Sequence, residues 1–100
     1  MQNPNPESYI VQIIEGPPRG DLYELEQATF FHVIDTASEQ IILSFRGDME
    51  ASLSRETAQW ENYHYSGVCK VSISEDQQAV LVEHFDGTQE FVSLSGITNE

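Results

Sequence analysis

The chain has 100 residues, the usual size of one domain, and an apolar share of 39% with 10% aromatic residues argues against a disordered polymer. Seventeen acidic residues stand against four basic ones, so the formal net charge at pH 7 is −13. Nucleic-acid binding relies on Lys and Arg to displace counterions from phosphates, and anionic membranes repel the same negative charge. The composition therefore argues against direct contact with DNA, RNA or anionic lipid surfaces.

The first twenty residues predict one strand between two irregular segments. Residues 1–7 are polar and hold two prolines, so we expect a disordered N-terminal tail. Tyr9–Ile14 is rich in aromatic and β-branched residues and predicts a strand. Gly16–Asp21 contains two prolines, which donate no backbone hydrogen bond, and predicts a turn.

The following segment predicts a hairpin. Glu24 and Glu26 alternate with apolar neighbours, which is the pattern of a half-buried strand. Phe30–Ile34 is apolar on both faces except at its histidine, so we expect it to lie centrally in a sheet. A turn over 36–40 leads to Ile41–Phe45, which predicts the returning strand.

Residues 48–62 leave two interpretations open. Met49, Leu53 and Trp60 approximate one face of a helix, and the intervening residues include good helix formers. Met49, Ala51 and Leu53 also alternate as in a strand. The pattern slightly favours a helix, which would make the fold α+β, and the strand remains the alternative.

The last third predicts a three-stranded antiparallel meander. Its strands are Val68–Ile73, Ala79–Phe85 and Glu90–Leu94. The first turn is acidic and covers 74–77. Asp86 and Gly87 form the second turn, and an Asp-Gly pair between alternating segments predicts a type I′ turn, with positive φ at both central positions.

These elements together predict a mainly β fold with six or more antiparallel strands. We expect a single domain over residues 8–95 and a loose C-terminal tail over 96–100. A small barrel, a two-sheet sandwich and a curved sheet all remain open. Exposed strand edges need to be covered or charged, and pairing with a second copy is one way to cover them, so the sequence leaves a homodimer open.

The sequence predicts neither a metal centre nor a cofactor site. His32, His64 and His84 lack the close spacing of metal motifs, and Cys69 has no cysteine partner. Glycine-rich phosphate-binding loops and a nucleophile elbow are both absent from the sequence. Cys69 lies in a predicted strand on the face of Val71, so we expect a buried and unreactive thiol. We therefore predict that the protein is not an enzyme.

Two groups of side chains are predicted to bind a partner: acidic residues of the second strand and a dense aromatic cluster. These residues are Asp21, Glu24, Glu26, Trp60, Tyr63 and Tyr65. Carboxylates steer a basic protein by complementary potential, and Tyr and Trp supply large contact areas. The prediction is an acidic interaction protein that binds a basic protein partner, as an inhibitor, an immunity protein or a nucleic-acid mimic.

One alternative function is kept. A barrel or curved sheet often encloses an apolar pocket, and Phe30, Phe45, Trp60 and Phe85 are the aromatic residues that would line one. The chain would then be a small-ligand-binding β-barrel module. For either function a cytoplasmic location is expected, because the chain has a single cysteine and no evident signal peptide.

Overall fold

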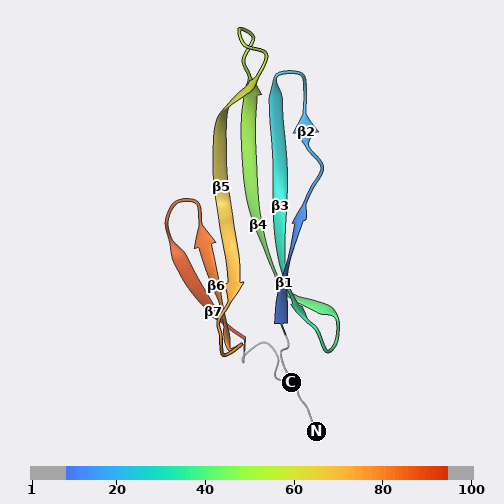
Figure 1. Cartoon of the computed structure of the whole chain (residues 1–100), viewed down its shortest axis with the longest axis vertical. Coiled ribbons are helices and arrows are strands. Elements are labelled where there is room, and N and C mark those ends of the chain that lie inside the picture. Colours follow the sequence, from blue (N-terminus) through green and yellow to red (C-terminus); the bar gives the residue numbers. More distant parts are fainter. Residues whose placement is uncertain (1–8, 95–100) are drawn as a thin grey trace.

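The computed structural model describes residues 9–94, which form a single open and curved sheet of seven antiparallel strands (Figure 1). The strands are β1 (Tyr9–Glu15), β2 (Arg19–Gly20), β3 (Glu24–Asp35), β4 (Gln40–Leu53), β5 (Trp60–Ile73), β6 (Ala79–His84) and β7 (Gln89–Ser93). Their order is β1-β3-β4-β5-β6-β7, and the short β2 also pairs with β3. The mainly β prediction is confirmed, and the predicted tails at 1–7 and 96–100 lie outside the described residues.

The core lies in one half of the molecule, where the sheet curls so that β1 comes to lie against β5 (Figure 1). The buried residues of this core are Phe31, Val33, Val68, Val71, Val80, Val82 and Leu94. They come from β3, β5 and β6 and from the residue after β7. Each fully buried Val or Leu contributes about 1.5–3 kcal/mol, so this apolar cluster is the main source of stability.

Gly47 of β4 and Gly67 of β5 face each other where β5 leaves its neighbour to join the core. A Cβ atom at Gly47 would lie 2.1 Å from the carbonyl oxygen of Val68. One at Gly67 would lie 2.7 Å from the carbonyl oxygen of Arg46, and the φ of Gly67 is +79°. Only glycine allows the two backbones to approach this closely.

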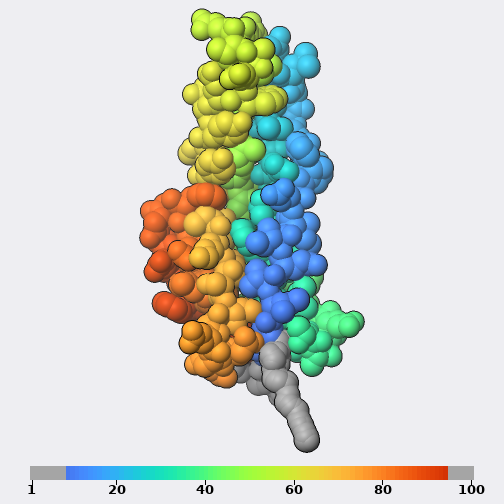
Figure 2. Space-filling model, viewed as in Figure 1, coloured from blue at the N-terminus to red at the C-terminus, as the bar shows by residue number. Residues whose placement is uncertain are grey.

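Beyond this glycine pair, the remaining half is a single layer of strands that we call the arm. Figure 2 shows it as a narrower extension of the core half. It consists of Glu24–Thr29 of β3, Gly47–Leu53 of β4 and Trp60–Gly67 of β5, with β2 at its side and a loop over 54–59 at its tip. The arm makes the molecule long and narrow, with extents of 63 × 25 × 20 Å.

The helix expected over 48–62 is wrong. Met49–Leu53 belongs to β4 and is paired with strands on both sides. Leu53 and Trp60 are cross-strand partners on the two sides of the tip loop. Their spacing of seven residues fits two turns of a helix equally well, which is why the sequence pattern was ambiguous. Ser54 closes the loop, because its hydroxyl accepts the backbone N–H groups of residues 56 and 57.

Cys69 is exposed, so the expectation of a buried thiol is also wrong. In the β5–β6 register, Val68 lies opposite His84 and Lys70 lies opposite Glu83, which leaves Cys69 as an extra, bulged residue. A bulge shifts the two-residue alternation of a strand. Val68 and Val71 are therefore both buried, although they are three residues apart.

The predicted meander of β5, β6 and β7 is confirmed, but its second turn is not of type I′. Gly87 has a φ of +92°, whereas Asp86 does not take a positive φ. The Asp86 carboxylate instead accepts the backbone N–H and the hydroxyl of Thr88, at 2.9 and 2.7 Å. The aspartate serves this turn as a hydrogen-bond acceptor.

Candidate functional site

One face of the arm carries carboxylates in neighbouring rows. The register places Glu26 directly opposite Glu50, with Arg19 on the other side of Glu26 and His64 on the other side of Glu50. Glu24 lies one row along the same face, and Glu24, Glu26 and Glu50 line a depression of about 200 Å³. We call Glu24, Glu26 and Glu50 the acidic face. Like charges directly opposite each other on a sheet destabilise it.

None of the four Lys and Arg residues forms an ion pair with the acidic face: Arg19 lies opposite Glu26 without one, and Lys70 lies opposite Glu83 in the core half. Arg46 pairs with Asp48 at 2.9 Å and lies over the Phe30 ring. Arg55 stacks on the ring of Tyr23, 4.5 Å from its centroid. No ion pair to the acidic face is present among residues 9–94. Its carboxylates are therefore available to a basic partner.

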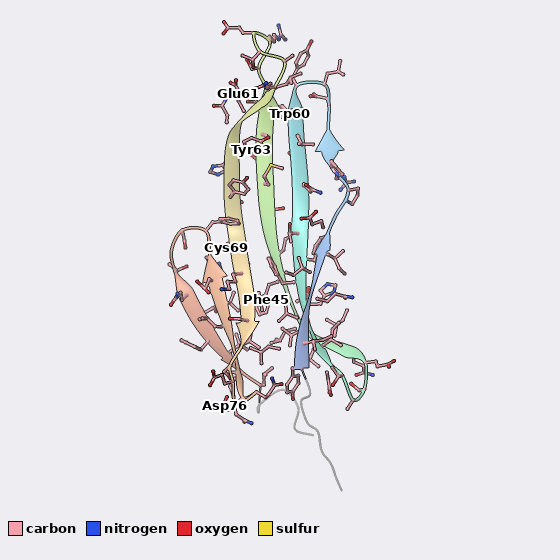
Figure 3. All side chains as sticks on the ribbon, viewed as in Figure 1. Phe45, Trp60, Glu61, Tyr63, Cys69 and Asp76 are labelled. Atoms are coloured by element: carbon pink, nitrogen blue, oxygen red, sulfur yellow. The ribbon has the colours of Figure 1, made fainter. Side chains whose placement is uncertain are left out.

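The opposite face of the arm carries a row of stacked aromatic rings. Tyr63 and Tyr65 have ring centroids 6.4 Å apart, and Tyr65 lies 5.1 Å from Phe85, which follows β6. All three are exposed, at 52%, 49% and 44%. Figure 3 shows Tyr63 on the arm, well away from Phe45, which lies in the core half. We call Tyr63, Tyr65 and Phe85 the aromatic ladder.

The two surfaces meet at an open strand edge. Residues 61–66 of β5 pair with β4 on one side, whereas β6 pairs with β5 only from Val68 onward. The described residues place no strand on the other side of 61–66, as Figure 1 shows. The carbonyl of Gly67 points toward β6, because it accepts the N–H of Phe85. Because strand backbone groups alternate in direction, the N–H and C=O of Tyr63 and Tyr65 point to the open edge as well.

A depression of about 360 Å³ continues this edge toward the β6–β7 turn. It is lined by side chains and backbone of His64, Tyr65, Ser66, Gly67, His84, Phe85 and Asp86. The depression leaves space for a chain that runs along β5 and passes over the turn. Edge and ladder together form a surface on which an extended segment can lie.

The structure divides the predicted partner-binding residues among four places. Glu24 and Glu26 lie on the acidic face, and Tyr63 and Tyr65 lie on the opposite face of the same arm. Trp60 is half-buried beside Leu53 near the tip.

Asp21 caps the start of β3. Its carboxylate accepts the backbone N–H groups of Tyr23 and Glu24, at 2.8 and 3.0 Å. Asp21 therefore stabilises this turn, a role that needs no binding partner.

Sequence reasoning did not include Glu50, and it named Phe85 only as a pocket-lining residue. Glu50 joins the acidic face only through the β3–β4 register, and Phe85 joins the ladder only because β6 returns beside Gly67. Neither long-range pairing has a local signal in the sequence.

His64 and His84 line the same depression, but the three histidines do not form a metal site in the described part of the chain. His32 lies on β3 opposite Gln12 and Ser44, and His84 contacts Glu90 through Nε2 at 3.0 Å. No group of three or more His, Cys, Asp or Glu side chains suited to a metal ion occurs among the described residues.

The aromatic residues considered for a ligand pocket are also dispersed. Phe45 packs against the core, Phe30 faces Arg46, Trp60 lies near the arm tip, and Phe85 belongs to the ladder.

Within the described part of the chain there is no helix that is long and apolar enough to cross a membrane. Comparisons of the chain with protein-family models, with curated proteins and with solved structures found no match.

Proposed function

We propose that the protein is a non-catalytic interaction module that binds a basic, extended segment of a partner protein along the open edge of β5. The observation that carries this proposal is the unpaired edge at residues 61–66, which lies between the acidic face and the aromatic ladder. An added strand would hydrogen-bond to the backbone of Tyr63 and Tyr65. This is the β-augmentation mode of peptide recognition.

The two faces of the arm predict the side chains of the bound segment. Successive residues of an added strand point to opposite faces. On one face they meet the aromatic ladder, which favours apolar or aromatic side chains. On the other face they lie beside His64 and approach Glu50, which favours the long side chains of Lys or Arg. The segment that fits best therefore alternates basic and apolar residues.

The acidic face supports the proposal because its arrangement is unfavourable for the protein alone. Glu26 and Glu50 are direct cross-strand neighbours in a sheet that has no ion pair to either residue among residues 9–94. Such a pair costs stability until a cation lies between the carboxylates. A Lys or Arg of a strand added at β5 reaches over His64 toward Glu50 and offsets part of this repulsion from that side.

The first test is fluorescence anisotropy with a labelled octapeptide in which Lys and Val alternate. We expect the peptide to bind at low salt and the affinity to fall as NaCl rises from about 50 to about 500 mM, because exposed charge pairs are screened. A peptide in which Glu replaces Lys should not bind. Equal binding of the two peptides, or an affinity that ignores salt, would contradict the proposal.

A matched pair of variants locates the site. Tyr65→Ala removes the central ring of the ladder and should weaken binding about tenfold, the usual effect of truncating an aromatic anchor. Phe91→Ala removes an even more exposed ring on β7, a strand that does not pair with β5, and should leave the affinity unchanged. A larger effect of Phe91→Ala than of Tyr65→Ala would place the binding surface elsewhere.

A further inference from the structure

A second exposed surface lies on the core half, on the outer side of β1, β3 and β4. The register arranges it in three rows: Ile14–Phe30–Arg46, Gln12–His32–Ser44 and Ile10–Ile34–Ile41. The opposite face of the same strands packs into the core through residues such as Phe31 and Val33. We call this outer surface the carboxylate-free block.

Five of the nine residues of the block are apolar, although nothing in the described residues covers them. Ile10 and Ile41 are 51% and 53% exposed, and Ile14 is also exposed. A half-solvated antiparallel strand normally places polar residues on its outer face. The block instead carries two apolar groups, Ile14–Phe30 and Ile10–Ile34–Ile41, on either side of the polar row Gln12–His32–Ser44. Exposed apolar residues grouped in this way mark an interaction surface.

The charge pattern of the block indicates which molecule covers it. In a chain with seventeen acidic residues, none of the nine positions of the block is Asp or Glu, and its one charged residue is Arg46. Two copies of this protein repel each other through a charge of −13 each. They approach at least cost where both surfaces lack carboxylates. A basic partner, by contrast, gains nothing from a surface without negative charge.

We propose that the carboxylate-free block is a homodimer interface, in which two copies pack these faces together about a two-fold axis. The interface is isologous, so the row Ile10–Ile34–Ile41 of one copy lies against the equivalent block of the other. The acidic face continues the same side of β3 and β4 beyond the block, but the β5 edge and the aromatic ladder lie on other strands and remain accessible in the dimer.

The area predicts a weak dimer. With strands about 4.8 Å apart and a rise of about 3.4 Å per residue, the block covers roughly 300 Å² per copy. A pair then buries about 600 Å², less than the roughly 1,200–2,000 Å² of stable interfaces. We expect a dimer that forms reversibly as the protein concentration rises.

Sedimentation equilibrium between about 10 µM and about 1 mM protein tests the proposal. We expect a monomer–dimer equilibrium that shifts toward dimer as NaCl rises from about 50 to about 500 mM, because salt screens the repulsion between copies. This sign is opposite to that expected for binding of the basic peptide, so failure of one proposal is distinguishable from failure of the other. A monomer at every concentration, or a dimer that salt dissociates, overturns the proposal.

Two isoleucines of β1 provide the matched variants. Ile10→Glu places a carboxylate inside the block, whereas Ile13→Glu places it on the other face of the same strand, at a position 61% exposed. Ile10→Glu should raise the dimer dissociation constant at least tenfold, and Ile13→Glu should leave it within about twofold. Ile41→Glu is a second block variant from β4 and should act like Ile10→Glu. Equal effects of Ile10→Glu and Ile13→Glu overturn the proposal, since pairing through the edge of β1 would respond to both.

Discussion

At the scale of single residues, Gly47 and Gly67 determine where the arm ends and the core begins. Their backbones are in such close contact that a side chain on Gly47 would overlap the carbonyl of Val68. Gly87 also has a positive φ, but nothing lies within 4 Å of the position that its Cβ would occupy. A side chain at Gly47 therefore lowers the stability of the fold more than one at Gly87.

We expect Gly47→Ala to lower the free energy of unfolding by about 3 kcal/mol or more, because β4 and β5 must separate to admit the methyl group. Gly87→Ala should cost only about 1 kcal/mol, for the left-handed backbone alone. Urea denaturation followed by circular dichroism measures both values. Equal losses for the two variants would show that the close approach at Gly47 does not constrain the fold.

Asp86 offers a prediction that depends on pH. The hydroxyl and the backbone N–H of Thr88 donate to its carboxylate and hold the pKa of Asp86 below its ordinary value of 3.8. A carboxyl whose pKa is lower in the folded state stabilises the fold above its unfolded pKa, and this contribution is lost as the pH falls through the folded pKa. The loss is expected below pH 3.8.

Thr88→Val removes the hydroxyl, which is the main cause of the lowered pKa. An NMR titration of the Asp86 carboxyl between about pH 2 and pH 6 should therefore show its pKa rising toward the ordinary value. Thr57→Val is a suitable control, since its hydroxyl bonds to Glu61 at the tip and not to Asp86. An unchanged pKa in Thr88→Val would refute the assignment.

At the scale of elements, β3, β4 and β5 each run through both the core half and the arm. The acidic face belongs to the arm, and we expect Glu50→Gln to increase the free energy of unfolding by about 0.2–1 kcal/mol, because it removes the repulsion with Glu26. The same variant should weaken binding of the Lys-Val peptide. Gains in stability at the expense of binding are characteristic of functional surfaces.

Glu15→Gln is the control for this prediction. Glu15 is exposed on β1 and lies opposite Thr29, so its removal relieves no close repulsion. If Glu15→Gln stabilises the protein as much as Glu50→Gln, the gain comes from net charge alone. Repulsion within the acidic face would then not lower the free energy of unfolding.

Strand positions could be predicted from alternation, but strand lengths and faces could not. The pattern identified Tyr9–Ile14 and the meander closely, because β-branched residues and turn residues are local signals. It divided β3 into two segments and gave β4 a helical alternative, because the pairing of Leu53 with Trp60 is a contact between strands. The bulge at Cys69 reversed the predicted face of that side chain for the same reason.

At the scale of the whole molecule, the even spread of charge along the chain becomes uneven in space. The acidic residues fall nine and eight in the two halves of the sequence. The register nevertheless gathers Glu24, Glu26 and Glu50 on the arm and leaves the block on β1, β3 and β4 without any carboxylate. Sorting of this kind depends on strand order, which composition does not contain.

The overall shape follows from the same separation into a core half and an arm. The radius of gyration is 17.5 Å, whereas a compact domain of 100 residues has about 13 Å. The excess is the single-layered arm, whose edge along β5 is available to a partner strand. An elongated molecule with one curled end is suited to presenting that edge.

Amide hydrogen exchange measured by NMR tests the binding of a strand to this edge most directly. The N–H groups of Tyr63 and Tyr65 point to the open edge, whereas those of Val80 and Val82 lie in the paired core. On addition of the Lys-Val peptide, exchange at Tyr63 and Tyr65 should slow at least tenfold, with no change at Val80 and Val82. Unchanged exchange at Tyr63 and Tyr65 in the saturated complex, or equal protection by the Glu-Val peptide, would contradict the proposal that a basic segment extends the sheet at β5.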